Sequence, residues 1–270
     1  MAEQLACTVG LIGAGSMGGS VARGLAESGV VGPGHVMACD HHAEKLAALA
    51  AVGVRTCATA EELLAERPDV VVLAVKPQVL SGVLEAAAPQ VAGSLVISVA
   101  AGVSVATLEA ALPGARVVRA MPNLPVQVRS GATALCAGVT ATPEDVELAR
   151  TLFSALGATA VMREDQLDVE SAVVGTAPAF FALFADTLTK AGVRAGLPAA
   201  ACRELVEATM RGCAEQLQVE GTHPRAYMER VTSPGGTTAA ALFELEPRLL
   251  EGSYAAVDAA LARTRELAGN

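Results

Sequence analysis

The stretch GLIGAGSMGGSVARGL, residues 10–25, joins a short apolar run to an amphipathic run through a cluster of glycines. Gly13, Gly15 and Gly18 give the spacing G-x-G-x-x-G, and they lie between an expected strand and an expected helix. We expect Gly13 to permit a tight turn, Gly15 to let the backbone approach a pyrophosphate, and Gly18 to let helix and strand pack closely. The stretch therefore predicts a dinucleotide-binding turn.

The expected helix after this turn begins near Ser16 and Met17. Its first N–H groups have no partner within the helix, and its positive dipole end points at the turn. Both properties suit a pyrophosphate. We therefore include Ser16 and Met17 among the cofactor-binding residues.

Asp40 follows the second apolar run, where an acidic residue would hydrogen-bond the adenosine ribose of the cofactor. A carboxylate in that place also repels a 2′-phosphate, which favours NADH over NADPH. His41, His42 and Lys45 are near enough in the sequence to offset this repulsion. The preference is a lean toward NADH, and NADPH stays open.

The first part of the chain alternates short β-branched runs with helical stretches. The strand-like runs are CTVGLI (7–12), HVMAC (35–39), DVVVLAV (69–75), SLVISVA (94–100) and ARVVRAM (115–121). Strands that are apolar throughout are typical of a parallel sheet covered by helices on both faces. We predict an α/β fold with a Rossmann-type doubly wound sheet over residues 1–163.

After residue 163 the strand signals end and the pattern becomes helical. We expect helices over residues 168–192, 199–220 and 247–267, with a break at AGVRAGLP. The second domain, residues 164–270, is therefore predicted to be all-helical. Its long alanine–leucine faces are more than one small domain covers, so we expect substrate binding and dimerisation there.

Composition excludes several classes of function. The chain has 270 residues, 52% of them hydrophobic, and a net charge of −9 without a basic block, so neither nucleic acid nor an acidic membrane is expected as a partner. No apolar run approaches the length of a membrane span, and Met1 is not followed by a basic signal region. The six cysteines are far apart and form no C-x-x-C pair, which predicts core residues and no metal site. We expect a cytoplasmic protein.

Two further motifs follow expected strands, at the edge where an open α/β sheet binds ligands. In AVKPQ, Lys76 and Pro77 stand where a lysine would contact the ribose or pyrophosphate, unless Lys76 is only solvated. In MPNLP, two prolines flank Asn123 and make a rigid loop. We expect Asn123 to orient the nicotinamide or the substrate, with a plain connection as the alternative.

The segment VTSPGGTTAAAL, residues 231–242, combines paired glycines with hydroxyl groups ahead of an apolar run. Gly235 and Gly236 before a helix would offer uncovered N–H groups to a carboxylate. Ser233, Thr237 and Thr238 add hydroxyls that donate or accept hydrogen bonds. The segment predicts an anion cradle with a polar rim, and a helix-entry turn with Thr237 as N-cap is the structural alternative.

These motifs together resemble the pyrroline-5-carboxylate reductase family, the enzymes of the last step of proline biosynthesis. The resemblance covers nearly the whole chain and is carried by five motifs in order: GLIGAGSMGGSVARGL (10–25), AVKPQ (74–78), MPNLP (121–125), AGVRAGLP (191–198) and HPRAYMERVTSPGGTTAAALFELE (223–246). It implies a Rossmann domain that binds NAD(P)H and a helical domain that forms a dimer, often assembled into rings of dimers. The reaction it implies is hydride transfer to the C=N bond of a cyclic imino acid.

The resemblance also implies residue roles in the late loop. Thr238 would hydrogen-bond the ring nitrogen, with Thr237 beside it as a second catalytic candidate. Ser233, Gly235, Gly236 and the neighbouring amides would hold the substrate carboxylate. Such roles are sensible because the cofactor supplies the hydride and the protein chiefly orients the reactants.

The chain departs from the family pattern Ser-Gly-Ser-Gly-Pro-Ala-Tyr at the start of its long helix. Val174, Ala177 and Phe180 replace polar or smaller residues, while Thr176 keeps a hydroxyl and is our further substrate-binding candidate. Leu124 replaces the threonine usual in the MPNTP motif. These changes add apolar groups near the expected pocket, so a substituted pyrroline or a six-membered piperideine carboxylate is an alternative substrate.

Two other functions compete with this interpretation. A β-hydroxyacid dehydrogenase also joins a Rossmann domain to helices, but it needs a lysine as general acid in a glycine-rich helical motif. Lys190 in FADTLTKAGV lacks those glycines and is expected to face solvent. A paralogue that binds dinucleotide without turnover is the alternative from outside the enzymes.

Overall fold

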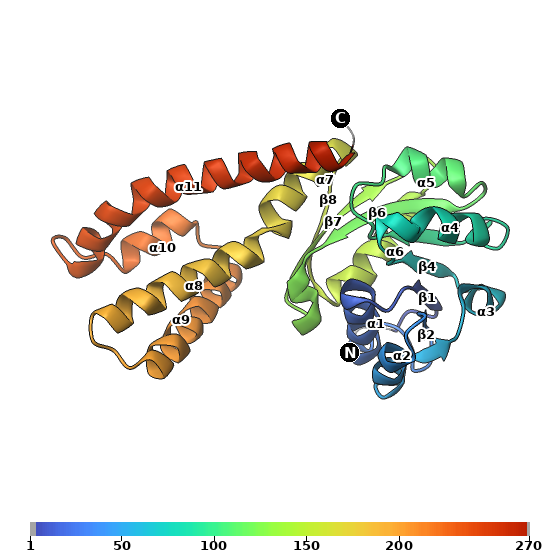
Figure 1. Ribbon diagram of the computed structural model, residues 1–270, viewed down its shortest axis with the longest axis horizontal. Coiled ribbons are helices and arrows are strands. Elements are labelled where there is room, and N and C mark those ends of the chain that lie inside the picture. The colour runs from blue at the N-terminus through green and yellow to red at the C-terminus, as the bar shows by residue number, and fades with distance from the viewer. Residues whose placement is uncertain (1–3, 269–270) are drawn as a thin grey trace. The chain divides into compact units, whose positions relative to one another are not determined.

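Residues 4–268 are described by a computed structural model, and the amino-terminal part is built on one eight-stranded sheet (Figure 1). The strands lie in the order β3-β2-β1-β4-β5-β6-β7-β8. Their bounds are β1 Val9–Ile12, β2 Val36–Cys39, β3 Arg55–Cys57, β4 Val70–Leu73, β5 Leu95–Ser98, β6 Arg116–Pro122, β7 Gly131–Ala137 and β8 Gly157–Val161. β6 and β7 pair antiparallel while the other pairs are parallel, so β7 and β8 run opposite to the first six strands.

Helices connect the strands and cover both faces of the sheet. Their bounds are α1 Ser16–Ser28, α2 Ala43–Ala50, α3 Ala60–Ala65, α4 Pro77–Ala87, α5 Val105–Ala111, α6 Pro143–Ser154 and α7 Glu164–Glu170. A 3-10 turn, η1 (Leu124–Val128), joins β6 to β7, and a π-helical turn, η2 (Ser171–Gly175), follows α7. This is the doubly wound arrangement that the sequence predicts.

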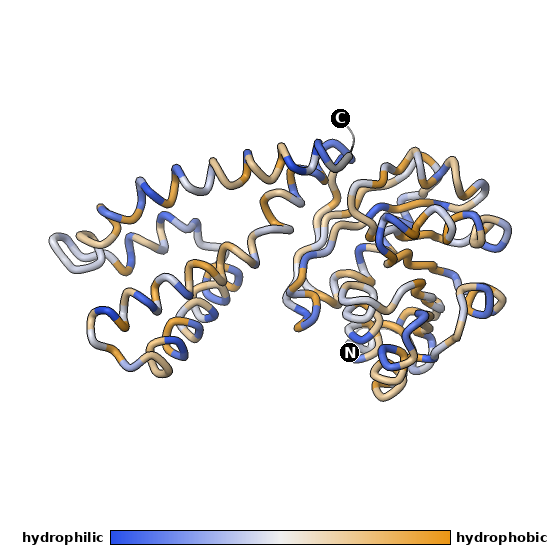
Figure 2. The backbone as a smooth tube through the Cα atoms, viewed as in Figure 1, coloured by the Kyte–Doolittle hydropathy of each residue, from blue (hydrophilic) through white to orange (hydrophobic). Residues whose placement is uncertain are grey.

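The core has two layers because the buried strands present apolar side chains on both faces. In β4, Val70 and Val72 belong to the cluster that includes side chains of α1 and α6. Val71 and Leu73 belong to the opposite cluster, with side chains of α3, α4 and α5. In Figure 2 the strands of this part are mostly orange, the colour of hydrophobic residues. Continuous apolar strands are what a parallel sheet with two covered faces requires.

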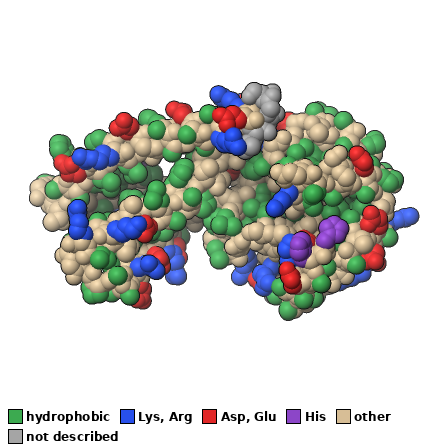
Figure 3. Space-filling model, in the orientation of Figure 1, with side chains coloured by type: hydrophobic (Ala, Val, Ile, Leu, Met, Phe, Trp, Pro, Cys, Tyr) green, Lys and Arg blue, Asp and Glu red, His purple; other side chains and the backbone are tan. Residues whose placement is uncertain are grey.

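The carboxyl-terminal part is helical in the residues that the structure describes. It comprises α8 Ala177–Arg194, α9 Ala199–Glu220, α10 Pro224–Arg230 and α11 Thr237–Ala268. Many of its apolar side chains are exposed, and hydrophobic groups are spread over its surface in Figure 3. The most exposed large ones include Phe181, Leu183, Leu205, Phe243 and Tyr254. So much exposed apolar surface is typical of a region that packs on a partner.

One helical stretch, Glu164–Arg194, has the length and apolar composition of a membrane span. One such helix is weak evidence for a membrane, because length and composition alone do not separate a membrane span from a helix that packs on a protein. Only 17% of its most apolar window is buried, so packing within this one chain does not account for its composition. The stretch is also interrupted by the π-helical turn η2.

The division between the two parts falls later than the expected boundary at residue 163. Contacts group the chain up to Thr176, and again from Arg263 to the end of α11, into one compact unit, and Ala177–Ala262 into a second. The boundary is later because α7 packs on β7 with Leu167 fully buried. The chain is thus helical from residue 164, but its first helix, α7, still packs on the sheet.

Two helix bounds differ from the sequence expectation. The helix expected over residues 168–192 is divided into α7, the π-helical turn and α8. The helix expected to start at Pro247 starts ten residues earlier, with Pro247 inside α11. A proline is preferred at the first turn of a helix, which is why the sequence places a start there, but here the helix continues through it.

The cysteines fit the prediction of core residues in part. Cys39, Cys136 and Cys202 are buried, and Cys7, Cys57 and Cys213 are half-buried. No group of three or more His, Cys, Asp or Glu side chains is gathered as a metal site in the described chain.

Candidate active site

The glycine-rich turn has the geometry that its sequence predicts. Gly13 has φ of +101°, and a Cβ there would lie 2.7 Å from the Ala74 carbonyl oxygen. A Cβ on Gly18 would collide with the Gly13 carbonyl. Around Gly15, in contrast, there is no atom within 4 Å of such a Cβ. The first and third glycines are thus needed by the fold, and the second faces open space that a ligand can occupy.

Helix α1 begins directly at this open position. Gly15 is its N-cap, with no side-chain cap, and the first helical residue is Ser16. Ser16 is exposed, and its Oγ accepts a hydrogen bond of 3.2 Å from Gln127 Nε2 of η1. Met17 is half-buried against the core. The N–H groups of this first turn lack helical acceptors, so the turn and the helix end fit a pyrophosphate.

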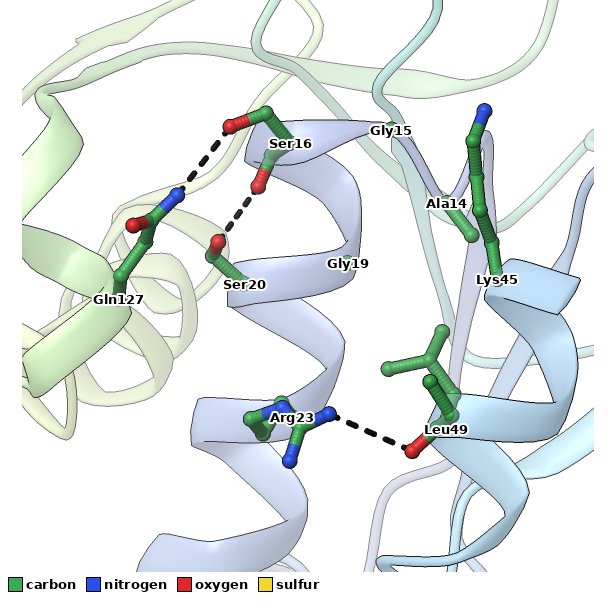
Figure 4. Close-up of a pocket in the computed structure, with 10 residues that line it drawn as sticks. Ala14, Gly15, Ser16, Gly19, Ser20, Arg23, Lys45, Leu49 and Gln127 are labelled. Atoms are coloured by element: carbon green, nitrogen blue, oxygen red, sulfur yellow. Dashed lines mark hydrogen bonds between the residues drawn. The ribbon is translucent and has the colours of Figure 1, made fainter.

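A groove of about 440 Å³ runs along α1 from this turn (Figure 4). It is lined by Ala14, Gly15, Ser16, Gly19, Ser20, Arg23, Lys45, Ala48, Leu49 and Gln127. The sequence pointed to its glycine end, but it did not single out Ser20, Arg23 or Gln127. Gln127 is distant in the sequence and no motif marks it, whereas Arg23 stands two turns along the expected helix.

Asp40 is at the carboxyl end of β2, as expected, but its carboxylate is already engaged. Its Oδ2 accepts the Ala14 N–H at 2.9 Å, and its Oδ1 accepts the His42 N–H at 2.9 Å. His42 Nδ1 lies 2.7 Å and Lys45 Nζ 3.4 Å from the same Oδ1. Asp40 thereby ties the glycine-rich turn to the start of α2.

The contacts of Asp40 also set its charge. Burial raises the pKa of this carboxyl, but the hydrogen bonds from His42 and Ala14 and the nearby Lys45 charge outweigh burial and lower the pKa to about 2. The group is therefore ionised throughout the physiological pH range.

Lys76 and Pro77 stand at the carboxyl edge of the sheet, after β4. Lys76 is the exposed N-cap residue of α4, and Pro77 occupies its first position. The ammonium group of Lys76 is thus available at the edge where a cofactor would bind. Its contact with the ribose or pyrophosphate stays a prediction.

Asn123 is more buried than the sequence suggests. Its side chain is 9% exposed, its Oδ1 accepts the Ala132 N–H at 2.8 Å, and its Nδ2 donates to the Val174 carbonyl at 3.2 Å. The side chain therefore fixes the loop between β6 and β7 and joins it to the π-helical turn. This geometry favours a positioning role over the direct contact with nicotinamide or substrate that we expected.

Thr176 follows the π-helical turn and is half-buried. Its hydroxyl donates to the Ala172 carbonyl at 2.6 Å, one turn earlier. The oxygen can still accept a hydrogen bond, but its proton is occupied.

The late double-glycine segment opens α11. Gly235 has φ of +69°, and the Gly236 N–H donates to the Ser233 carbonyl at 3.0 Å. The Gly236 carbonyl accepts from Ala240, so Gly236 holds the cap position and Thr237 is already the first helical residue. The alternative of Thr237 as N-cap is therefore wrong.

The hydroxyls of this segment are free among the residues that the structure describes. Ser233 and Thr237 are exposed and Thr238 is half-exposed, and none of the three makes a side-chain hydrogen bond there. The helix start offers uncovered N–H groups beside them. The segment has the parts of an anion cradle, and it belongs to the second compact unit, whereas the glycine-rich turn belongs to the first.

Lys190 has the solvent-facing position that we predicted. Its side chain is 74% exposed and its Nζ pairs with Asp186 at 2.7 Å, one turn away on α8. This is a surface ion pair and gives no support to a lysine general acid.

Comparisons with known proteins agree with this geometry. A model of pyrroline-5-carboxylate reductase dimerisation matches residues 164–267, and a model described as NADP oxidoreductase coenzyme F420-dependent matches residues 8–102. Pyrroline-5-carboxylate reductase 3 of Bos taurus is 37% identical over 97% of this chain and 86% of its own length. The chain belongs to the pyrroline-5-carboxylate reductase family.

Other members of the pyrroline-5-carboxylate reductase family give the same result. The reductase of Methanosarcina acetivorans is 35% identical over 96% of this chain and 97% of its own length. The Coxiella burnetii reductase structure matches with a TM-score of 0.92 at 33% identity, over 97% of this chain and 99% of that one. The Plasmodium falciparum structure, which has NADP bound, matches with a TM-score of 0.85 at 26% identity, over 98% of this chain and all of that one. The Rossmann-type fold and the helical dimerisation region are thus those of the family.

Proposed function

We propose that this protein reduces the C=N bond of a cyclic imino acid with NAD(P)H, and that the substrate is 1-pyrroline-5-carboxylate and the product L-proline. One observation supports the proposal above all. This chain aligns over nearly its whole length with pyrroline-5-carboxylate reductases that are about one-third identical to it. The open space at Gly15 and the uncovered helix start at Thr237 give the two anion-binding elements that this reaction needs.

In the proposed mechanism the cofactor supplies the hydride, and the chain binds and orients. Gly13, Gly15 and Gly18, with Ser16 and Met17, hold the pyrophosphate, and Lys76 and Pro77 line the same edge. Gly235, Gly236 and Ser233 hold the substrate carboxylate. Thr238 hydrogen-bonds the ring nitrogen, with Thr237 and Thr176 as further polar contacts. Asn123 keeps the loop between β6 and β7 in place.

Orientation is the main contribution that such a site makes to the rate. Holding reactants in line is worth up to roughly 7–11 kcal/mol in ideal cases. A threonine hydroxyl suits the ring nitrogen because it accepts from a protonated imine and donates to the amine product. The proposed site therefore has a neutral hydroxyl, rather than a charged general acid, at the ring nitrogen.

A larger or more apolar cyclic imine is the second candidate substrate. Leu124 stands where the family has threonine, and its side chain is 53% exposed beside Asn123. Phe180 stands where the family has tyrosine and is 38% exposed. These apolar groups favour a substituted pyrroline or a piperideine carboxylate.

Purified protein supplied with cyclic imines and either cofactor tests the proposal. We expect oxidation of NADH or NADPH with 1-pyrroline-5-carboxylate, and cofactor reduction with L-proline and NAD⁺ at high pH. Turnover of only substituted or six-membered rings would select the second candidate. Binding of dinucleotide without any turnover would show a non-catalytic paralogue.

We also propose a homodimer formed through the exposed apolar faces of α8, α9 and α11, with a larger ring of dimers as a further assembly. We place it in the cytoplasm, with no nucleic-acid or membrane partner. The lean toward NADH that Asp40 suggested is less well supported than the sequence implied, because the carboxylate already accepts hydrogen bonds from Ala14 and His42.

A further inference from the structure

The ribose end of the cofactor site has an internal charge balance. Asp40 is ionised and only 11% exposed, and both of its oxygens accept backbone N–H groups. It thus works first as an anchor between the glycine-rich turn and α2. His42 and Lys45 crowd Oδ1, and Oδ2 keeps one acceptor position, so this carboxylate can accept one ribose hydroxyl but not two.

Lys45 offsets the charge of this carboxylate. Its ammonium nitrogen lies 3.4 Å from Asp40 Oδ1 and 3.1 Å from His42 Nδ1. Its side chain is still 37% exposed, and in Figure 4 it rises from α2 toward the level of Gly15. Figure 3 shows histidine side chains beside basic and acidic ones on this face. The repulsion that Asp40 would exert on a 2′-phosphate is therefore opposed at close range.

Arg23 is a second cation in the groove, but it is directed elsewhere. Its Nη2 donates to the Ala48 carbonyl at 3.3 Å, and its Nη1 lies 3.6 Å from Glu27. These contacts hold it between α1 and α2, away from Asp40. Lys45, in contrast, lines the groove and also contacts the Asp40 carboxylate.

We propose that Lys45 is the residue that discriminates between the two cofactors and that it lets this site accept the 2′-phosphate of NADPH. The inference rests on the proposed function, because it assumes that the turn holds a dinucleotide. The ammonium leaves Asp40, or bridges to it, and pairs with the phosphate. A lysine does this as a point charge on a flexible chain. Asp40 keeps the turn in place with either cofactor.

The test compares the dissociation constants of NADPH and NADH for Lys45→Gln and the parent at one ionic strength. We expect the constant for NADPH to rise about tenfold, since one charge-assisted hydrogen bond is lost. The constant for NADH should stay within about twofold, and Lys45→Arg should restore NADPH binding. Arg23→Gln is the matched control, a cation removed from the same groove, and should leave the ratio of the two constants unchanged.

Asp40→Asn distinguishes two roles of this carboxylate, which are fixing the glycine-rich turn and binding the ribose hydroxyls. An anchor predicts that both cofactors bind more weakly, because the turn loses its charged acceptor. A group that binds the ribose hydroxyls predicts a loss of NADH affinity alone, because NADPH carries a phosphate in place of the 2′-hydroxyl, and that result would overturn the inference. Equal loss of both cofactors in Lys45→Gln, or no loss, would overturn it as well.

Failure of the inference and failure of the proposed function give different results. Imine reduction with an unchanged cofactor ratio in Lys45→Gln removes the inference alone. Lys45-dependent discrimination in a protein that reduces no cyclic imine removes the proposed activity alone. Absence of any dinucleotide binding removes both.

Discussion

Glu170 is a buried carboxyl whose ionisation should weaken the fold as the pH rises. It ends α7, is 7% exposed, and its Oε2 has no hydrogen-bond partner among the described residues. Burial raises the pKa of this carboxyl from 4.5 to about 7. In the unfolded chain the group ionises at its ordinary value, so the folded state binds the proton more tightly.

The sign and size of the effect follow from this difference. The free energy of unfolding is unaffected by this group below about pH 4.5, falls as the pH rises toward about 7, and then levels off. A shift from 4.5 to about 7 corresponds to about 3 kcal/mol at about 1.4 kcal/mol per unit. Between about pH 5 and about pH 8 the loss is about 2–3 kcal/mol.

Glu170→Gln should remove this loss, because an amide is neutral at every pH. The assay is urea unfolding of parent and variant at about pH 5 and about pH 8, at one protomer concentration. The free energy of unfolding of the variant minus that of the parent should be about 2–3 kcal/mol larger at about pH 8 than at about pH 5. Comparing differences cancels every other titrating group and the cost of burying the amide.

Glu85→Gln replaces an exposed carboxyl of α4 and serves as the control. The free energy of unfolding of Glu85→Gln should differ from that of the parent by the same amount at both pH values. If Glu170→Gln behaves like this control, within about 0.5 kcal/mol, then Glu170 is not held in an apolar site and the argument fails.

Four further substitutions test the two proposed anion-binding elements and the loop between β6 and β7. Gly15→Ala should weaken cofactor binding at least tenfold (about 1.4 kcal/mol) with an unchanged melting temperature, because a Cβ there enters open space. Gly18→Ala should lower both the cofactor affinity and the melting temperature, since its Cβ meets the Gly13 carbonyl. Equal melting temperatures for the two variants would contradict this. Asn123→Ala should cost about 2–4 kcal/mol of unfolding free energy, measured by urea titration, because it takes the side-chain partner from the part-buried Ala132 N–H and Val174 carbonyl. A loss under about 1 kcal/mol would show that water replaces the amide. Thr238→Ala should lower kcat with little change in cofactor affinity by titration, and a collapse of that affinity would place the segment elsewhere.

Much of the fold could be predicted because its strands are buried on both faces. Val70–Leu73 is apolar throughout and Leu95–Ser98 is apolar except for Ser98, and short runs of this kind are typical of buried strands. β7 and β8 gave no clear signal, because GATALCA and GATAV are rich in glycine, alanine and threonine. Their pairing is decided by neighbouring strands rather than by local preference.

The candidate site could be predicted only as far as its backbone chemistry. Glycine spacing fixes where the turn lies, and Gly13, Gly15 and Gly18 have the geometry expected of them. Side-chain roles were harder, since they depend on contacts between distant segments. Asn123 meets Val174, and Gln127 meets Ser16, across intervals that no pattern marks. For the same reason the burial of Glu170 could not be read from a polar residue in a helical run.

The reversal of direction between β6 and β7 makes the loop that joins them sensitive to its number of residues. The connecting turn η1 returns the backbone to the same border of the sheet, so that Ala132, the second residue of β7, meets Asn123. Removing a single residue from residues 124–130 would slide one strand past the other and exchange its inward and outward faces. Asn123 would then lose its contact with Ala132 through a change in alignment alone, with its own amide unchanged.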